Sequence, residues 1–138
     1  MSIEESYMLQ AIDLAKKGRG RVAPNPLVGC VIVIDRKIIG EGYHRKFGES
    51  HAEVDAINNC TESPHDADLY VTLEPCIMCG GASFWTQIKR IVYGASDEKR
   101  GFSNLESSVL HPKTEVTKAI HEEKCSKILQ DFFQNKRT

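Results

Sequence analysis

The segment from residue 69 to residue 93 constrains the possible folds of this chain most strongly. Its apolar pattern predicts a strand over residues 69–73, a helix over 76–88 and a further strand over 91–93. Pro75 suits the opening of the helix, because the first turn of a helix does not need the backbone N–H that proline lacks. A strand, a helix and a strand in this order predict a right-handed crossover between parallel strands. We therefore expect a sheet that is covered by helices.

Two patterns near the start of the chain add a helix and two strands. Ser2 and Glu5 form a capping-box pair, and apolar residues repeat at helical spacing from there to about Gly18. Residues 27–34 are rich in β-branched side chains. A short polar turn follows, and the next segment, residues 38–42, begins with two apolar residues. This arrangement predicts a β-hairpin directly after the first helix.

Two more helices complete the predicted architecture. A short helix is expected over residues 51–59, with Ser50 as its N-cap. No linker-like stretch or repeat divides the chain, so we expect a single domain over residues 1–138. The fold class that these elements predict is α/β, a three-layer α/β/α sandwich with a mixed central sheet. A final helix carries an apolar stripe that we expect to dock on the sheet, formed by Cys125, Ile128, Leu129, Phe132 and Phe133.

Composition excludes several classes of protein. Apolar residues make up 41% of the chain, which excludes intrinsic disorder, and 18 Lys and Arg against 19 Asp and Glu argue against broad adhesion to nucleic acid. The apolar run over residues 27–34 is far shorter than the roughly 18 residues of a membrane span. The acidic opening, residues 1–5, lacks the basic start of a signal peptide. We therefore expect a cytoplasmic protein with reduced cysteines.

Four residues carry the chemical signal of the sequence: His51, Glu53, Cys76 and Cys79. Two cysteines at i and i+3 at a helix start can reach one ion, and the positive end of the helix dipole favours their thiolate forms. An imidazole and two thiolates are typical zinc ligands, whereas a closed structural zinc site has four ligands. The open position predicts a bound water, and Glu53 is expected to act as a base on that water.

Hydrolysis is the reaction class that this set favours. Zinc lowers the pKa of a bound water from about 15.7 toward about 7, and a neighbouring carboxylate can move the proton to a leaving group. The spacing also matches the H-x-E…P-C-x-x-C signature of zinc deaminases. Taken alone, Cys76 and Cys79 also fit a redox pair or a structural zinc site, and Glu53 also fits a capping partner of Ser50.

The chain resembles the cytidine deaminase-like superfamily from about residue 24 to residue 137. Residues 25–33 and 40–44 look like the deaminase domain of the bifunctional riboflavin-pathway enzyme. That enzyme has a longer insert between its two cysteines and a reductase domain. Bacterial tRNA adenosine deaminase is more similar to residues 73–82, 90–95 and 125–137, although it has Asn where His44 stands; Phe84 and Trp85 resemble guanine deaminases instead.

The resemblance implies roles for individual residues. His51, Cys76 and Cys79 would bind Zn²⁺, and Glu53 would shuttle protons. Substrate-binding roles would fall to Asn25, His44 and Pro75. Members of the superfamily commonly form homodimers, so a homodimer is expected here.

The leading substrate is adenosine in a tRNA anticodon loop, which would become inosine. The alternatives are a small free base or nucleotide (guanine, cytosine or a riboflavin-pathway aminopyrimidine) and a non-catalytic, zinc-containing subunit that binds RNA. The presence of Glu53 disfavours that last alternative. Phe132 and Phe133 fit either core packing or stacking on RNA bases.

The remaining histidines and cysteines receive structural predictions. We expect His65, His111 and His121 to lie on the surface, and Cys30, Cys60 and Cys125 to behave as small hydrophobic residues.

Overall fold

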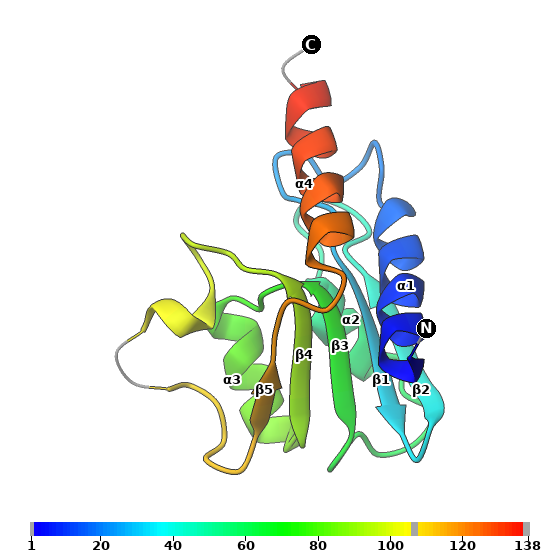
Figure 1. The fold of residues 1–138 in the computed structure, drawn as a ribbon, viewed down its shortest axis with the longest axis vertical. Coiled ribbons are helices and arrows are strands. Elements are labelled where there is room, and N and C mark those ends of the chain that lie inside the picture. The colour runs from blue at the N-terminus through cyan, green and yellow to red at the C-terminus, as the bar shows by residue number, and fades with distance from the viewer. Residues whose placement is uncertain (1, 106–107, 137–138) are drawn as a thin grey trace.

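The computed structural model describes residues 2–105 and 108–136. Residue 137 lies outside this range; it is the last residue of the segment that resembles the tRNA deaminase. None of the helices in this described part of the chain has the length and apolar character of a membrane span. The elements, shown in Figure 1, are α1 (Ile3–Lys16), β1 (Gly29–Ile34), β2 (Lys37–Tyr43), α2 (Ala52–Asn58), β3 (Asp68–Leu73), α3 (Ile77–Thr86), β4 (Arg90–Ala95), the 3₁₀ turn η1 (Phe102–Asn104), β5 (Glu115–Thr117) and α4 (Glu122–Lys136).

The strands form one mixed sheet in the order β2-β1-β3-β4-β5. Strand β1 is antiparallel to both β2 and β3, whereas β3, β4 and β5 are parallel to one another. The predicted hairpin and the predicted crossover from β3 through α3 to β4 are both confirmed. The carboxyl ends of the parallel strands share one edge of the sheet, where ligand sites of α/β proteins usually lie.

Helices cover both faces of the sheet, which confirms the predicted three-layer α/β/α sandwich. Val31 and Val33 point to the face covered by α1 and α4, whereas Cys30 and Ile32 point to the face covered by α2 and α3. In Figure 1, α1 and α4 lie in front of the sheet, and α2 and α3 lie behind it. Strand β1 is buried on both faces, which explains why residues 29–34 form an almost continuous apolar run.

Local chemistry fixes where the helices begin and how closely they pack. The predicted capping box of Ser2 and Glu5 is present at the start of α1. Helix α2 lies so close to β2 that a Cβ atom on Gly42 would collide with the backbone of Ala52 and Ala56. This close approach fixes the position of the first turn of α2, where the functional residues lie.

Two predicted helix starts are wrong in detail. The N-cap of α2 is His51, not Ser50, and the His51 side chain makes no capping hydrogen bond. The carbonyl oxygen of Ser50 instead lies 3.0 Å from Nδ1 of His44. Helix α3 begins at Ile77 with Cys76 as N-cap, so Pro75 precedes the helix instead of opening it, and the helix already ends at Thr86.

The remaining differences come from tertiary packing. Cys125, Ile128, Leu129 and Phe132 of α4 pack on the sheet as predicted, but the fifth residue of the stripe, Phe133, is 43% exposed. His121 is partly buried, and its Nε2 lies 3.5 Å from a carboxylate oxygen of Glu5, so its predicted surface position is wrong. Strand β5 was not predicted, because its three residues are largely exposed and leave little apolar pattern.

Candidate active site

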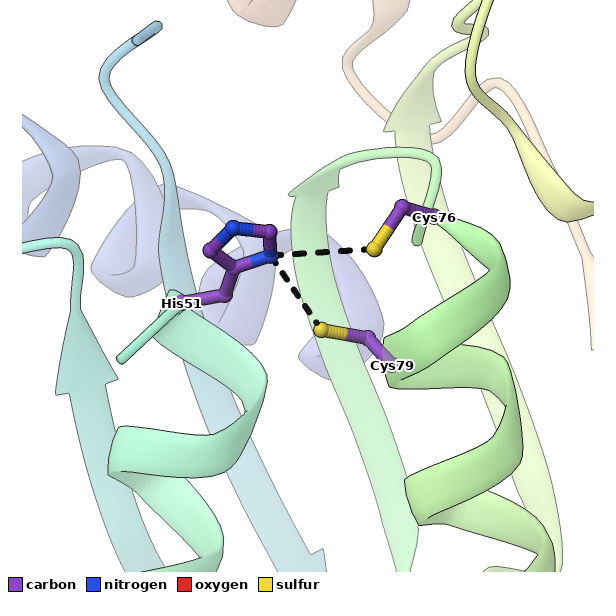
Figure 2. Close-up of side chains that lie close together, drawn as sticks. All are labelled: His51, Cys76 and Cys79. Carbon is purple, nitrogen blue, oxygen red and sulfur yellow. Dashed lines mark hydrogen bonds between the residues drawn. The ribbon is translucent and has the colours of Figure 1, made fainter. Parts of the chain in front are cut away.

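Three potential metal ligands converge from the starts of two neighbouring helices. His51 is the N-cap of α2, Cys76 is the N-cap of α3, and Cys79 lies in the first turn of α3. Figure 2 shows the imidazole pointing at the two sulfurs across the gap between these helices. Residues 25 or more positions apart in the sequence therefore meet, as the sequence predicted.

The distances fit a tetrahedral zinc ion. Nδ1 of His51 lies 3.7 Å from Sγ of Cys76 and 3.5 Å from Sγ of Cys79. Zn–N bonds of about 2.0 Å and Zn–S bonds of about 2.3 Å place tetrahedral N and S ligands about 3.5 Å apart. Within residues 2–105 and 108–136, these three residues are the only group with metal-ligand geometry. Their donor atoms therefore fit zinc and leave one coordination position open.

The electrostatics of the cysteine pair favour metal binding. A hydrogen bond from the Cys79 thiol lowers the pKa of Cys76 to about 5 and raises that of Cys79. The backbone of Cys79 and the nearby His51 also lower the pKa of Cys76. The lowered pKa of Cys76 favours its thiolate, the form in which cysteine binds metals.

Glu53 lies beside this group without belonging to it. Its side chain is only 5% exposed, and it borders the same cavity as His51 and Cys76. Burial raises the pKa of Glu53 to about 7, although His51 and a hydrogen bond with Cys79 act in the opposite direction. The position agrees with a base beside the metal and not with a fourth ligand.

Two of the three predicted substrate-binding residues line the cavity. His44 is 3% exposed, and its Nε2 lies 3.1 Å from Nδ2 of Asn25. The Nδ1–H of His44 donates to the carbonyl oxygen of Ser50, so Nε2 is free to accept a hydrogen bond from the Asn25 amide. Pro75 does not line the cavity: its side chain is fully buried and its carbonyl oxygen accepts a hydrogen bond from Phe102. This position gives no support to a substrate-binding role for Pro75.

The cavity has a volume of about 570 Å³, which is typical of a small-molecule site. Several of its residues were not predicted from the sequence. Leu129 and Phe133 contribute an apolar wall from α4, and residues 96–100, which follow β4, contribute a charged rim. The sequence does contain one indication of this rim: residues 96–100 directly follow a parallel strand, and ligand sites usually form at the carboxyl ends of such strands.

The fold and the site together define an α/β protein with a His-Cys-Cys zinc site beside a buried glutamate. The family model of the cytidine and deoxycytidylate deaminase zinc-binding region matches residues 1–95. The chain belongs to this family. The family and the donor set together establish zinc as the cofactor.

The chain is similar to curated proteins of riboflavin biosynthesis. The chain is 41% identical to the riboflavin biosynthesis protein RibD of Bacillus amyloliquefaciens over 88% of its own length and 36% of that protein. It is 37% identical to the diaminohydroxyphosphoribosylamino-pyrimidine deaminase of Buchnera aphidicola, over 96% of this chain and 95% of that protein. The chain spans about a third of the length of RibD-type relatives, but almost all of the Buchnera protein.

Among solved structures, a RibD protein is more similar to this chain than a structure from work on tRNA deaminases. RibD of Acinetobacter baumannii superposes with a TM-score of 0.84 at 37% identity, over 96% of this chain and 39% of that chain. A structure from work on tRNA:A34 deaminases superposes with a TM-score of 0.77 at 29% identity, over 90% of this chain and 99% of that chain. The comparisons therefore favour the predicted aminopyrimidine alternative over the leading expectation of a tRNA substrate.

Proposed function

We propose that this protein is a zinc-dependent hydrolytic deaminase of a phosphoribosylamino-pyrimidine nucleotide. The observation that carries the proposal is the match to the Buchnera deaminase, which extends over nearly the full length of both chains. The His-Cys-Cys group and the buried Glu53 supply the chemistry that such a reaction requires. The non-catalytic RNA-binding alternative lacks comparable support, because Glu53 is present and lines the cavity.

His51, Cys76 and Cys79 would hold the metal. A bound zinc ion would act as a Lewis acid, which makes water nucleophilic at neutral pH. The oxygen of a water molecule adds to the ring carbon that bears the exocyclic amine. Glu53 accepts a proton from this water and delivers it to the adjacent ring nitrogen. It then moves the remaining hydroxyl proton to the amine, so that the C–N bond breaks, ammonia leaves and a ring carbonyl remains.

Asn25 and His44 would orient the base in this reaction. The hydrogen bond between them fixes the Asn25 amide, and its Nδ2 donates to His44. Oδ1 of Asn25 is then directed to accept a hydrogen bond from an N–H group of the substrate. Because His44 holds Asn25 through this contact, we assign His44 a positioning role in the pocket.

An ammonia-release screen tests the proposed function. The zinc-loaded protein is incubated with the diaminopyrimidine nucleotide, with guanine, cytosine and their nucleosides, and with an anticodon stem-loop. We expect ammonia from the pyrimidine nucleotide alone. Inosine formation in the stem-loop without activity on the nucleotide would overturn the proposal in favour of the tRNA substrate, and no ammonia from any compound would favour a non-catalytic subunit.

We also propose a homodimer that forms through α3. Ile77, Met78 and Trp85 on this helix are 48%, 61% and 83% exposed, and a Cβ atom on Gly81 would meet open space. Spacing at i, i+4 and i+8 places Ile77, Gly81 and Trp85 on one face. An exposed apolar face of this kind is typical of an interface.

Sedimentation velocity tests the dimer. Trp85→Glu is expected to produce a monomer, whereas the control Phe47→Glu, at another exposed aromatic residue (56% exposed), should leave the dimer intact. A wild-type monomer, or a Trp85→Glu dimer of unchanged stability, would contradict an interface on α3.

A further inference from the structure

The loop after β4 places two cations at the rim of the active-site cavity. Lys99 and Arg100 are the only lysine and arginine side chains among the described residues that line this cavity. Both side chains are exposed, and the same cavity is bordered by His51 and Glu53. The loop therefore places two cations on the same cavity as the reaction centre.

Glu74, directly before the Pro-Cys motif, holds this loop in place. Its side chain is 3% exposed, and its two carboxylate oxygens accept hydrogen bonds from the backbone N–H groups of Asp97 (3.1 Å) and Ser103 (2.9 Å). A Cβ atom on Gly101 would collide with the same carboxylate, so only glycine allows this approach. The two ends of the loop are thus tied to one buried anion beside the metal ligands.

A second carboxylate shapes the segment that carries the cations. Oδ1 of Asp97 accepts hydrogen bonds from the backbone N–H groups of Lys99 (3.1 Å) and Arg100 (2.9 Å). The carboxylates of Glu74 and Asp97 therefore already have backbone donors as partners. Besides Glu74 and Asp97, this part of the cavity contains one more acidic residue, Glu98. Glu98 is exposed, as are Lys99 and Arg100. The exposed side chains of this rim, Glu98, Lys99 and Arg100, sum to one positive charge, whereas the less exposed carboxylates of Asp97 and Glu74 are engaged with backbone N–H groups.

We propose that Lys99 and Arg100 bind the phosphate of the nucleotide substrate. This inference rests on the proposed function, because it assigns a site to the phosphate of the phosphoribosylamino group. A guanidinium and an ammonium form charge-assisted hydrogen bonds to phosphate oxygens, and the guanidinium can do so with two N–H groups at once. The base would then lie at the metal end of the cavity against Asn25, and the ribose would lie beside the apolar wall of Leu129 and Phe133.

Steady-state kinetics with two forms of one substrate test this site. The wild type, Lys99→Ala/Arg100→Ala and the control Lys37→Ala/Lys113→Ala are compared on the diaminopyrimidine nucleotide and on its dephosphorylated form. The control removes two exposed cations, Lys37 at the start of β2 and Lys113 shortly before β5, which lie at the opposite end of the sheet. We expect the first double variant to raise KM for the nucleotide about 10- to 100-fold, with kcat and activity on the dephosphorylated form unchanged.

Each other outcome has a separate meaning. An unchanged KM for the nucleotide would overturn the phosphate site while leaving the proposed function intact, and so would an equal loss on both forms of the substrate. A wild type that does not act on the nucleotide would overturn the proposed function itself.

Discussion

Replacing Glu74 by Gln is expected to destabilise the protein and to loosen the loop that borders the cavity. The carboxylate accepts one backbone hydrogen bond on each oxygen, and both bonds are largely shielded from water. An amide keeps one acceptor but turns an N–H group toward the other backbone donor. Hydrogen bonds to charged groups contribute about 1.5–3 kcal/mol each, and an unpaired buried donor adds a further cost. We therefore expect a loss of about 2–4 kcal/mol in the free energy of unfolding.

Urea unfolding followed by circular dichroism measures this loss. With a slope of about 2 kcal/mol per molar urea, the middle of the range for small proteins, the midpoint should fall by roughly 1–2 M. Glu62→Gln is the matched control, because Glu62 forms an exposed ion pair with Lys37 and such pairs contribute at most about 1 kcal/mol. Equal midpoints for the two variants would show that the buried carboxylate does not hold the loop.

Three further predictions concern the cysteines and the proton shuttle. Glu53→Gln should retain stoichiometric zinc by atomic absorption yet lose almost all ammonia release; near-wild-type turnover would remove Glu53 from the chemistry. Cys76→Ala should lose zinc and unfold at lower urea concentration, because metal binding is linked to folding, and unchanged zinc content would contradict its assignment as a ligand. Burial raises the pKa of Cys125 to about 12, so in the native protein at pH 8 this thiol should resist iodoacetamide, as read by peptide mass; rapid labelling would show that α4 opens.

Much of the fold follows from patterns that the sequence displays directly. The apolar run that became β1, the crossover over β3, α3 and β4, and the capping box of Ser2 were all predicted, because burial on both faces and helical periodicity leave local signals. The N-cap of α2 was misplaced by one residue. Ser50 is the better capping residue by type, but its backbone is engaged by His44, a contact between segments that local propensity does not encode.

The candidate site was predictable where its chemistry lies within short motifs. His51, Cys76 and Cys79 meet as expected, because each lies at the start of a helix that leads from the same region of the sheet. Lys99 and Arg100 had only a weak signal, their place shortly after a predicted strand, and the apolar stripe that includes Phe133 did not show that this residue borders the cavity, because that position depends on tertiary packing. Pro75 is likewise bonded to a distant segment, since its carbonyl oxygen accepts a hydrogen bond from the N–H of Phe102, and no local pattern encodes this contact.

Hydrolytic deamination at this site is tested most directly by the origin of the oxygen atom in the product. The zinc-loaded protein is supplied with the diaminopyrimidine nucleotide in water enriched in the heavy oxygen isotope, and the product is analysed by mass spectrometry. We expect one equivalent of ammonia and one solvent oxygen in the new ring carbonyl for each turnover, with neither formed by Glu53→Gln. Product that carries no solvent oxygen, or equal turnover by the Gln variant, would contradict hydrolytic deamination at this site.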